Sequence, residues 1–89
     1  MRVFETRRFK KDLKNYKSNR AVLLELRKVI NVLIEDNALP AKYQDHELKG
    51  KYKGIRELHL KPDDLLMYVK VKNESVTLLA IGSHSKLFK

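Results

Sequence analysis

The fold is decided by residues 55–83, which read IRELHLKPDDLLMYVKVKNESVTLLAIGS. Three runs of β-forming residues are interrupted by Lys61-Pro62-Asp63 and by Asn73-Glu74. Proline and aspartate favour a turn, and a two-residue gap with asparagine is typical of a hairpin. The stretch therefore predicts three consecutive strands, mostly antiparallel. The runs are residues 55–60, 65–72 and 76–83.

Two amphipathic helices are expected before these strands. Phe9, Leu13 and Tyr16 recur at i, i+4 and i+7 behind Thr6, whose hydroxyl can cap the first turn. Few residues separate the two helices, which predicts an antiparallel helical hairpin. The second helix has its cap at Ser18 or Asn19, its buried face at Val22, Leu26, Val29, Ile30 and Leu33, and its end before Leu39-Pro40.

The remaining segments complete an α+β fold. Arg2–Glu5 alternates polar and apolar residues, which indicates a short first strand, and residues 41–54 carry no sustained period, which indicates an irregular loop. The expected order is β-α-α-β-β-β, with the helical hairpin packed on one face of a mostly antiparallel sheet. Residues 1–89 are expected to form one domain, and the opposite sheet face to be wet or covered by a partner.

Composition excludes several classes of protein. The chain has no cysteine, which excludes disulfides, iron–sulfur clusters and thiol catalysis. It has no apolar run of the length that spans a membrane, and its first residues show no apolar core of a signal peptide. We therefore expect a cytoplasmic protein with no membrane partner.

The charge distribution points to a polyanionic partner. The net charge is +9, and residues 1–20 alone carry eight basic and two acidic side chains. Residues 41–62 add six basic and three acidic ones. Such a charge is typical of nucleic-acid binding, although a solvated basic surface or docking to an acidic protein would also explain it.

Three histidines form the candidate catalytic set. His46, His59 and His84 each lie among polar residues, with Glu57 and Asp63 nearby in the sequence. Cleaving RNA without a metal requires a base for the ribose 2′-hydroxyl, an acid for the leaving oxygen and positive charge at the phosphorane. Histidine can serve as base or acid at cellular pH. Each histidine alone would usually be an ordinary surface residue.

A metal site is not expected. His46-Glu47 resembles the start of the HExxH zinc motif, but position 50 is glycine, and no two histidines have helical i, i+4 spacing. The candidates for contacting RNA are basic or aromatic side chains, namely Lys49, Lys51, Lys53, Arg56, Lys61, Tyr52 and Phe88.

These residues occur in an ordered series of motifs. Residues 43–54 read YQDHELKGKYKG, residues 56–63 read RELHLKPD, and residues 81–88 read IGSHSKLF. In this order and spacing the chain resembles the YafQ branch of the RelE/ParE toxin superfamily, over nearly its whole length. Tyr52 stands where that branch usually has a tryptophan.

The resemblance implies a RelE-like fold and a ribosome-dependent mRNA interferase, an endoribonuclease that acts without a cofactor or metal. It implies a cognate antitoxin as partner, in a heterotetramer, with the free toxin a monomer. Carried over by motif, the catalytic positions are His46, His59, Asp63 and His84, with Glu57 as an acidic companion and Phe88 positioning a base. His84 is the leading general acid, His59 or His46 the base, and Asp63 orients a ring. Lys51, Lys53 and Arg56 would contact phosphate.

Two alternatives remain open from the sequence. The first is a ParE-like toxin that binds DNA gyrase and does not hydrolyse RNA, although that branch generally lacks the clustered histidines. The second is a basic RNA- or ribosome-binding module without catalysis, in which the three histidines would be dispensable.

Overall fold

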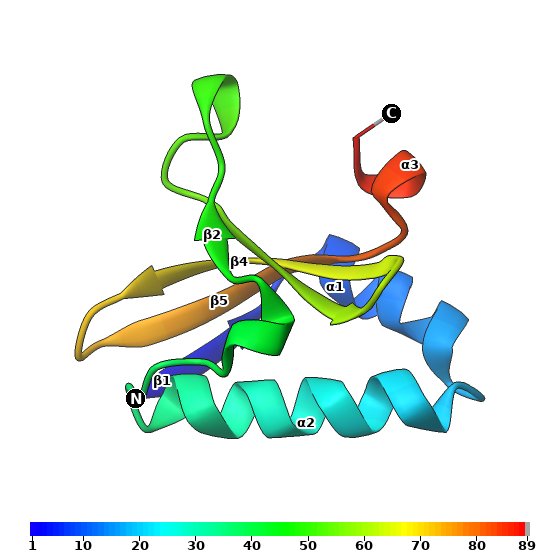
Figure 1. Cartoon of the computed structure of the whole chain (residues 1–89), viewed down its shortest axis with the longest axis horizontal. Coiled ribbons are helices and arrows are strands. Elements are labelled where there is room, and N and C mark those ends of the chain that lie inside the picture. Colours follow the sequence, from blue (N-terminus) through cyan, green and yellow to red (C-terminus); the bar gives the residue numbers. More distant parts are fainter. Residues whose placement is uncertain (89) are drawn as a thin grey trace.

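The structure, a computed structural model, describes residues 1–88 and consists of a five-stranded sheet with helices (Figure 1). The main elements are β1 (Arg2–Glu5), α1 (Arg7–Leu13), α2 (Arg20–Ile34), β2 (His46–Glu47), β3 (Arg56–Lys61), β4 (Asp64–Val71), β5 (Ser75–Gly82) and α3 (His84–Leu87). Single 3-10 turns lie at η1 (Lys14–Tyr16), η2 (Ala41–Tyr43) and η3 (Gly50–Tyr52).

The strand order is β1-β5-β4-β3-β2. Strand β1 runs parallel to β5, while β5, β4, β3 and β2 pair antiparallel in turn. Helix α2 lies along one face of the sheet, and α3 rises from the opposite face (Figure 1). This confirms the expected α+β architecture with its helical hairpin on one face. No helix within residues 1–88 is both long and apolar enough to cross a membrane.

Both expected helix caps are present. The Thr6 hydroxyl accepts from the Phe9 N–H at 3.0 Å, and the Asn19 side-chain oxygen accepts from the Val22 N–H at 3.1 Å. Asn19 rather than Ser18 is therefore the second cap. Each cap satisfies an amide that has no partner within the helix, which starts the helix at a defined residue.

The main core lies between the helices and the sheet. Alternation along β3 and β4 sends Leu58, Leu66 and Tyr68 toward the helices, where each is at most 1% exposed. The helices supply the other half of this core through the stripes that the sequence predicted. Their buried members are Phe9, Val22, Leu26, Val29 and Leu33.

The opposite face of the sheet is covered in part by the chain itself, which corrects the expectation of a wet or partner-covered face. Leu65, Met67 and Ala80 are buried there beneath Leu87 of α3. Side chains of the β2–β3 connection and the C-terminus pack around this second cluster; they are Leu48, Tyr52, Ile55 and Phe88. A thin two-layer protein thereby acquires a small second core.

Residues 41–54 are more ordered than expected. Two 3-10 turns and the strand β2 lie within them, and His46 of β2 pairs with Glu57 of β3. Helix α3 was likewise not predicted. Strand β2 has two residues and α3 has four, and both are shorter than the stretch over which a period can be recognised in a sequence.

Asp45 ties this segment to the sheet. Its carboxylate accepts from the Tyr68 hydroxyl at 2.5 Å and from Arg56 Nη2 at 2.8 Å. Burial and this acceptor raise the pKa of Tyr68, so the phenol remains a donor across the physiological range. The hydrogen bond of Arg56 to Asp45 likewise raises the pKa of the guanidinium.

Replacing Asp45 by alanine is expected to lower the free energy of unfolding by about 1–3 kcal/mol, because it leaves the buried Tyr68 hydroxyl without its acceptor. Asp45→Asn keeps an acceptor oxygen and is the matched control, with a smaller loss. Chemical denaturation of the three proteins measures the difference. Equal stability of wild type and Asp45→Ala would show that the network contributes nothing to the fold.

Candidate active site

Strand pairing places two histidines and a carboxylate on one face of the sheet. His46 lies opposite Glu57 in the β2–β3 pair, and His59 follows Glu57 by two residues on the same face of β3. The alternation predicted from the sequence is thus confirmed for Glu57 and His59. Glu57 nevertheless is only 5% exposed, because β2 and the second cluster lie beside it.

The same face brings His84 and Asp63 to this end of the sheet. His59 pairs with Leu65 of β4, and Leu65 pairs with Gly82 of β5, two residues before His84. The main-chain N–H of His84 points to Oδ1 of Asp63, 3.5 Å away, which links the β3–β4 turn to the start of α3. The five expected catalytic side chains therefore come from four segments, and strand register places His59 two strands away from Gly82, the end of β5 that leads to His84.

His46 and Glu57 form a close pair. His46 Nε2 lies 3.7 Å from Glu57 Oε1, and His46 Nδ1 lies 2.7 Å from the carbonyl oxygen of Gln44. Because a carbonyl only accepts, Nδ1 carries a proton and Nε2 faces the carboxylate. The other oxygen of Glu57, Oε2, is buried without a hydrogen-bond partner among residues 1–88. An unsatisfied buried carboxylate oxygen is costly and is typical of functional sites.

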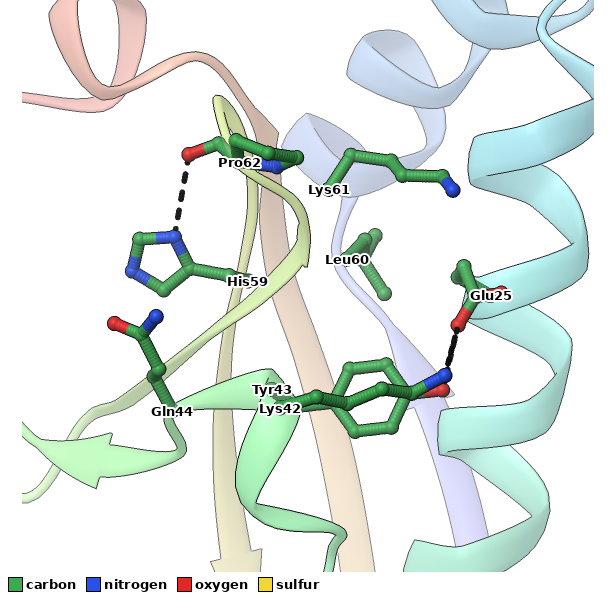
Figure 2. Close-up of a pocket in the computed structure, with 8 residues that line it drawn as sticks. All are labelled: Glu25, Lys42, Tyr43, Gln44, His59, Leu60, Lys61 and Pro62. Atoms are coloured by element: carbon green, nitrogen blue, oxygen red, sulfur yellow. Dashed lines mark hydrogen bonds and ion pairs between the residues drawn. The ribbon is translucent and has the colours of Figure 1, made fainter.

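His59 is held in one tautomer. Its Nδ1 lies 3.3 Å from the carbonyl oxygen of Pro62, again an acceptor only, so Nδ1 donates and Nε2 keeps its lone pair in the neutral ring. Figure 2 shows the ring projecting from β3 with this Nδ1–H directed at the turn that follows the strand. A neutral imidazole with a free Nε2 can accept a proton.

An aromatic row connects the C-terminus to the β2–β3 connection. The Phe88 ring packs against His84 with centroids 4.8 Å apart and meets Tyr52 edge-on at 5.5 Å. Lys51 Nζ lies 5.3 Å from the centroid of the Tyr52 ring. Tyr52 and Phe88 are therefore brought together beside His84, where a flat surface and a cation border the histidine.

The expected basic residues divide into two groups. Lys49, Lys51 and Lys53 are exposed on the β2–β3 connection, on the side of the sheet that bears the histidines. Arg56 does not join them, because it precedes Glu57 and points to the other face, where it pairs with Asp45. Lys61, at the end of β3, is exposed and lines a cleft.

This cleft has a volume of about 380 Å³ and lies beside the end of β3 (Figure 2). Strand β2 pairs only with Arg56 and Glu57, so turn η2 rather than a strand accompanies the rest of that edge within residues 1–88. The cleft connects the His59 side of β3 to the α2 side. It is lined by Glu25, Lys42, Tyr43, Gln44, His59, Leu60, Lys61 and Pro62.

The wall of the cleft on the α2 side is firmly anchored. The buried Tyr43 hydroxyl donates to Glu25 Oε1 at 2.6 Å, and Lys28 and Lys42 each lie 3.5 Å from the same carboxylate. The hydrogen bond from Tyr43, followed by the two lysines, lowers the pKa of Glu25 below its ordinary value. Burial and Glu25 raise the pKa of Tyr43 to about 12. Sequence reasoning identified neither Glu25 nor Gln44 as part of a site.

No group of three or more His, Asp or Glu side chains within the described residues has an arrangement that would hold a metal ion. What the site does present is three histidines, one of them with a carboxylate at its ring and another with a carboxylate at its main-chain N–H, together with lysines and two aromatic rings. Such a set can remove one proton, deliver another and neutralise a negative charge between them.

Comparisons with known proteins agree with this description. A family model described as the bacterial toxin of type II toxin–antitoxin systems, YafQ, matches residues 1–89. The mRNA interferase toxin YafQ of Escherichia coli K12 is 33% identical over 81 residues, covering 90% of this chain and 87% of that protein.

Two solved structures are similar over nearly the whole length. A metal-bound toxin from Helicobacter pylori is 44% identical with a TM-score of 0.88, covering 99% of each chain. The YafQ chain of the E. coli DinJ–YafQ complex is 31% identical with a TM-score of 0.85, covering 100% of each chain.

Proposed function

Because the chain belongs to the YafQ family of toxins from bacterial type II toxin–antitoxin systems, we propose that it cuts messenger RNA by general acid–base catalysis, without a metal ion. Cutting takes place on translating ribosomes in the cytoplasm. The observations that support this proposal are the placement of His46, Glu57 and His59 on one face of the sheet and the contact of Asp63 with the start of α3, which carries His84.

His59 serves as the general base. Its Nδ1–H is engaged by the Pro62 carbonyl, which leaves Nε2 to take the proton from the ribose 2′-hydroxyl. The 2′-oxygen then attacks the adjacent phosphorus and the bond to the 5′-oxygen breaks. The products are a 2′,3′-cyclic phosphate, or the 3′-phosphate formed from it, and a 5′-hydroxyl.

His84 serves as the general acid that protonates the 5′ leaving oxygen. Asp63 positions it by accepting from its main-chain N–H, and the Phe88 ring supports the imidazole from one side. In the sequence, Asp63 was expected to orient a ring; its contact in the structure is to the backbone of His84. Phe88 is also placed to stack on a base near the leaving group.

His46 carries positive charge toward the phosphorane. Glu57, 3.7 Å from its Nε2, supplies a counter-charge for the protonated ring. Lys51 and Lys53 add exposed positive charge from the β2–β3 connection, which stabilises the negative phosphorane. Arg56 contributes indirectly, since its bond to Asp45 fixes the residue that precedes His46.

The partner follows from the family. A toxin of a type II system is held inactive by a cognate antitoxin, and we propose one with an acidic segment that lies over the basic surface. Residues 1–20 supply most of that charge. Ribosome binding through the same lysines and arginines would weaken steeply with salt, because bound phosphates release counterions.

Single-site chemical substitution of the message tests the mechanism. We expect a 2′-deoxynucleotide placed immediately 5′ of a mapped cut to abolish that cut while neighbouring cuts persist, because no 2′-oxygen remains to attack. The fragments of the unmodified message should carry 5′-hydroxyls, detected by direct labelling with polynucleotide kinase. Fragments with 5′-phosphates, or continued cutting at the deoxy position, would point instead to metal-assisted hydrolysis by water.

A further inference from the structure

The cleft at the end of β3 opens directly beside the proposed base. His59 and Gln44 line the cleft on one side of β3, as Figure 2 shows, so a base attached to a ribose at His59 would lie next to the Gln44 side of the cleft. The volume of about 380 Å³ lies in the range typical of sites for small organic groups. The position and the volume of the cleft are therefore suited to binding one nucleobase.

The charges of the cleft favour a neutral polar group over a phosphate. Glu25 lies in its wall, and the ammonium of Lys42 is already directed at that carboxylate, 3.5 Å away. A phosphate beside Glu25 would therefore meet a negative charge and a cation that has a partner, so a phosphate is better placed at the rim, where Lys61 lies. Pro62, which is exposed, contributes apolar surface suited to the face of a base, while Leu60 beneath it is buried in the core.

Gln44 joins the cleft to the catalytic residues. Its main-chain carbonyl accepts from Nδ1 of His46, while Figure 2 shows its side-chain amide directed toward the ring of His59. The residue has φ 50° and ψ 40°, a left-handed conformation that is unfavourable for a side chain other than glycine or asparagine. Unfavourable backbone of this kind persists where surrounding contacts hold it, often at binding sites.

We propose that this cleft is a base-recognition subsite in which the Gln44 amide hydrogen-bonds the edge of the nucleobase that carries the attacking 2′-hydroxyl. An amide offers a donor and an acceptor side by side, which matches the mixed pattern on base edges. Lys61 at the rim then contacts the phosphate that precedes this nucleotide. The inference rests on the proposed function and adds to it a residue that selects the sequence at the cut.

The test compares Gln44→Leu with the wild type on a pool of translated messages. Leucine keeps the size of the side chain and the main-chain carbonyl but removes the amide. Asn37→Leu, which removes an exposed amide after α2, is the matched control. Sequencing the 5′ ends of the fragments gives the cutting frequency for each base on the 5′ side of the cut.

We expect Gln44→Leu to reduce, by about tenfold, the ratio of cutting at the favoured base to cutting at disfavoured bases on the 5′ side of the cut. This is in line with the discrimination of one amide–base pair. Sites with a disfavoured base should be cut as before, and Asn37→Leu should keep the wild-type preference. An unchanged preference, or a uniform loss at all sites, would overturn the proposal, because either result restricts Gln44 to holding His46.

A binding measurement separates this inference from the proposed function. An RNA trinucleotide with 2′-O-methyl groups cannot be cut, and we expect it to shift the NMR signals of the Gln44 side-chain amide but not those of Asn37. If the wild type cuts no message, the proposed function fails, and the titration then tests the base-recognition subsite independently of cutting. Absence of a shift at the Gln44 amide would overturn the proposal that the cleft binds a base.

Discussion

Replacing His84 by alanine is expected to slow the cutting of translated messages by about 10²–10⁴-fold, the usual contribution of a positioned acid or base. The 5′ leaving oxygen would then depart without a proton. The His84 side chain is exposed, and its contact with Asp63 uses the main-chain N–H, which alanine retains. The thermal midpoint and ribosome binding should therefore remain close to those of the wild type. Primer extension on a translated message measures the rate.

Ser85→Ala is the control for this experiment, because Ser85 is exposed in the same short helix and has no part in the mechanism. Cutting by His84→Ala at the wild-type rate would remove the general acid from the proposal. If all three histidines could be replaced without effect, the non-catalytic RNA-binding alternative would stand instead. A supercoiling assay with gyrase covers the ParE-like alternative.

Replacing Glu57 by glutamine is expected to lower activity and raise stability at the same time. The neutral amide provides no counter-charge for a protonated His46. We therefore expect cutting to slow by about 10- to 100-fold, a smaller effect than the loss of a general acid or base, because Glu57 acts through His46. The same change removes a buried carboxylate whose Oε2 has no partner within residues 1–88. The gain in unfolding free energy should be about 1 kcal/mol, and the thermal midpoint should rise by about 4–8 °C.

Glu47→Gln is the matched control, since Glu47 follows His46 in β2, is exposed, and loses the same charge. It should leave the rate and the thermal midpoint nearly unchanged. The two measurements on Glu57→Gln discriminate between roles, because a purely structural carboxylate would lose stability when neutralised. A variant that is less stable, with activity reduced only in proportion to its folded fraction, would contradict a role in the reaction. Higher stability with lower activity is the pattern of a group retained for function.

Arg56 is the basic residue whose expected place at the site was wrong. Arg56 and Glu57 are neighbours in one motif, and both were expected at the site. The pleat of β3 directs them to opposite faces, so Arg56 pairs with Asp45 behind the sheet. Arg56 lies two and four residues before Leu58 and Leu60, which face the helices, and residues at this spacing share a face of a strand. The sequence therefore already separated Arg56 from Glu57 and His59.

Other features had no signal in the sequence. The left-handed backbone of Gln44 is held by contacts of η2 with β3 and by the bond from His46. The burial of Glu57 depends on β2, a strand of two residues, and on the second cluster beneath α3. Strand β2 and helix α3 are both too short to show a periodic pattern in the sequence. Each forms because segments distant in the sequence pack against it.

The helical hairpin, the three-stranded meander and the candidate catalytic residues could be identified from the sequence alone. Apolar spacing of 3.6 or 2 and local caps at Thr6 and Asn19 depend only on near neighbours, which is why those elements could be read directly. Which polar side chains lie close together depends on how the strands and loops pack in three dimensions. The approach of His46 to Glu57, the contact of Asp63 with His84 and the cleft beside His59 arise from strand register and from loops folded over the sheet. These are properties of pairings between residues far apart along the chain.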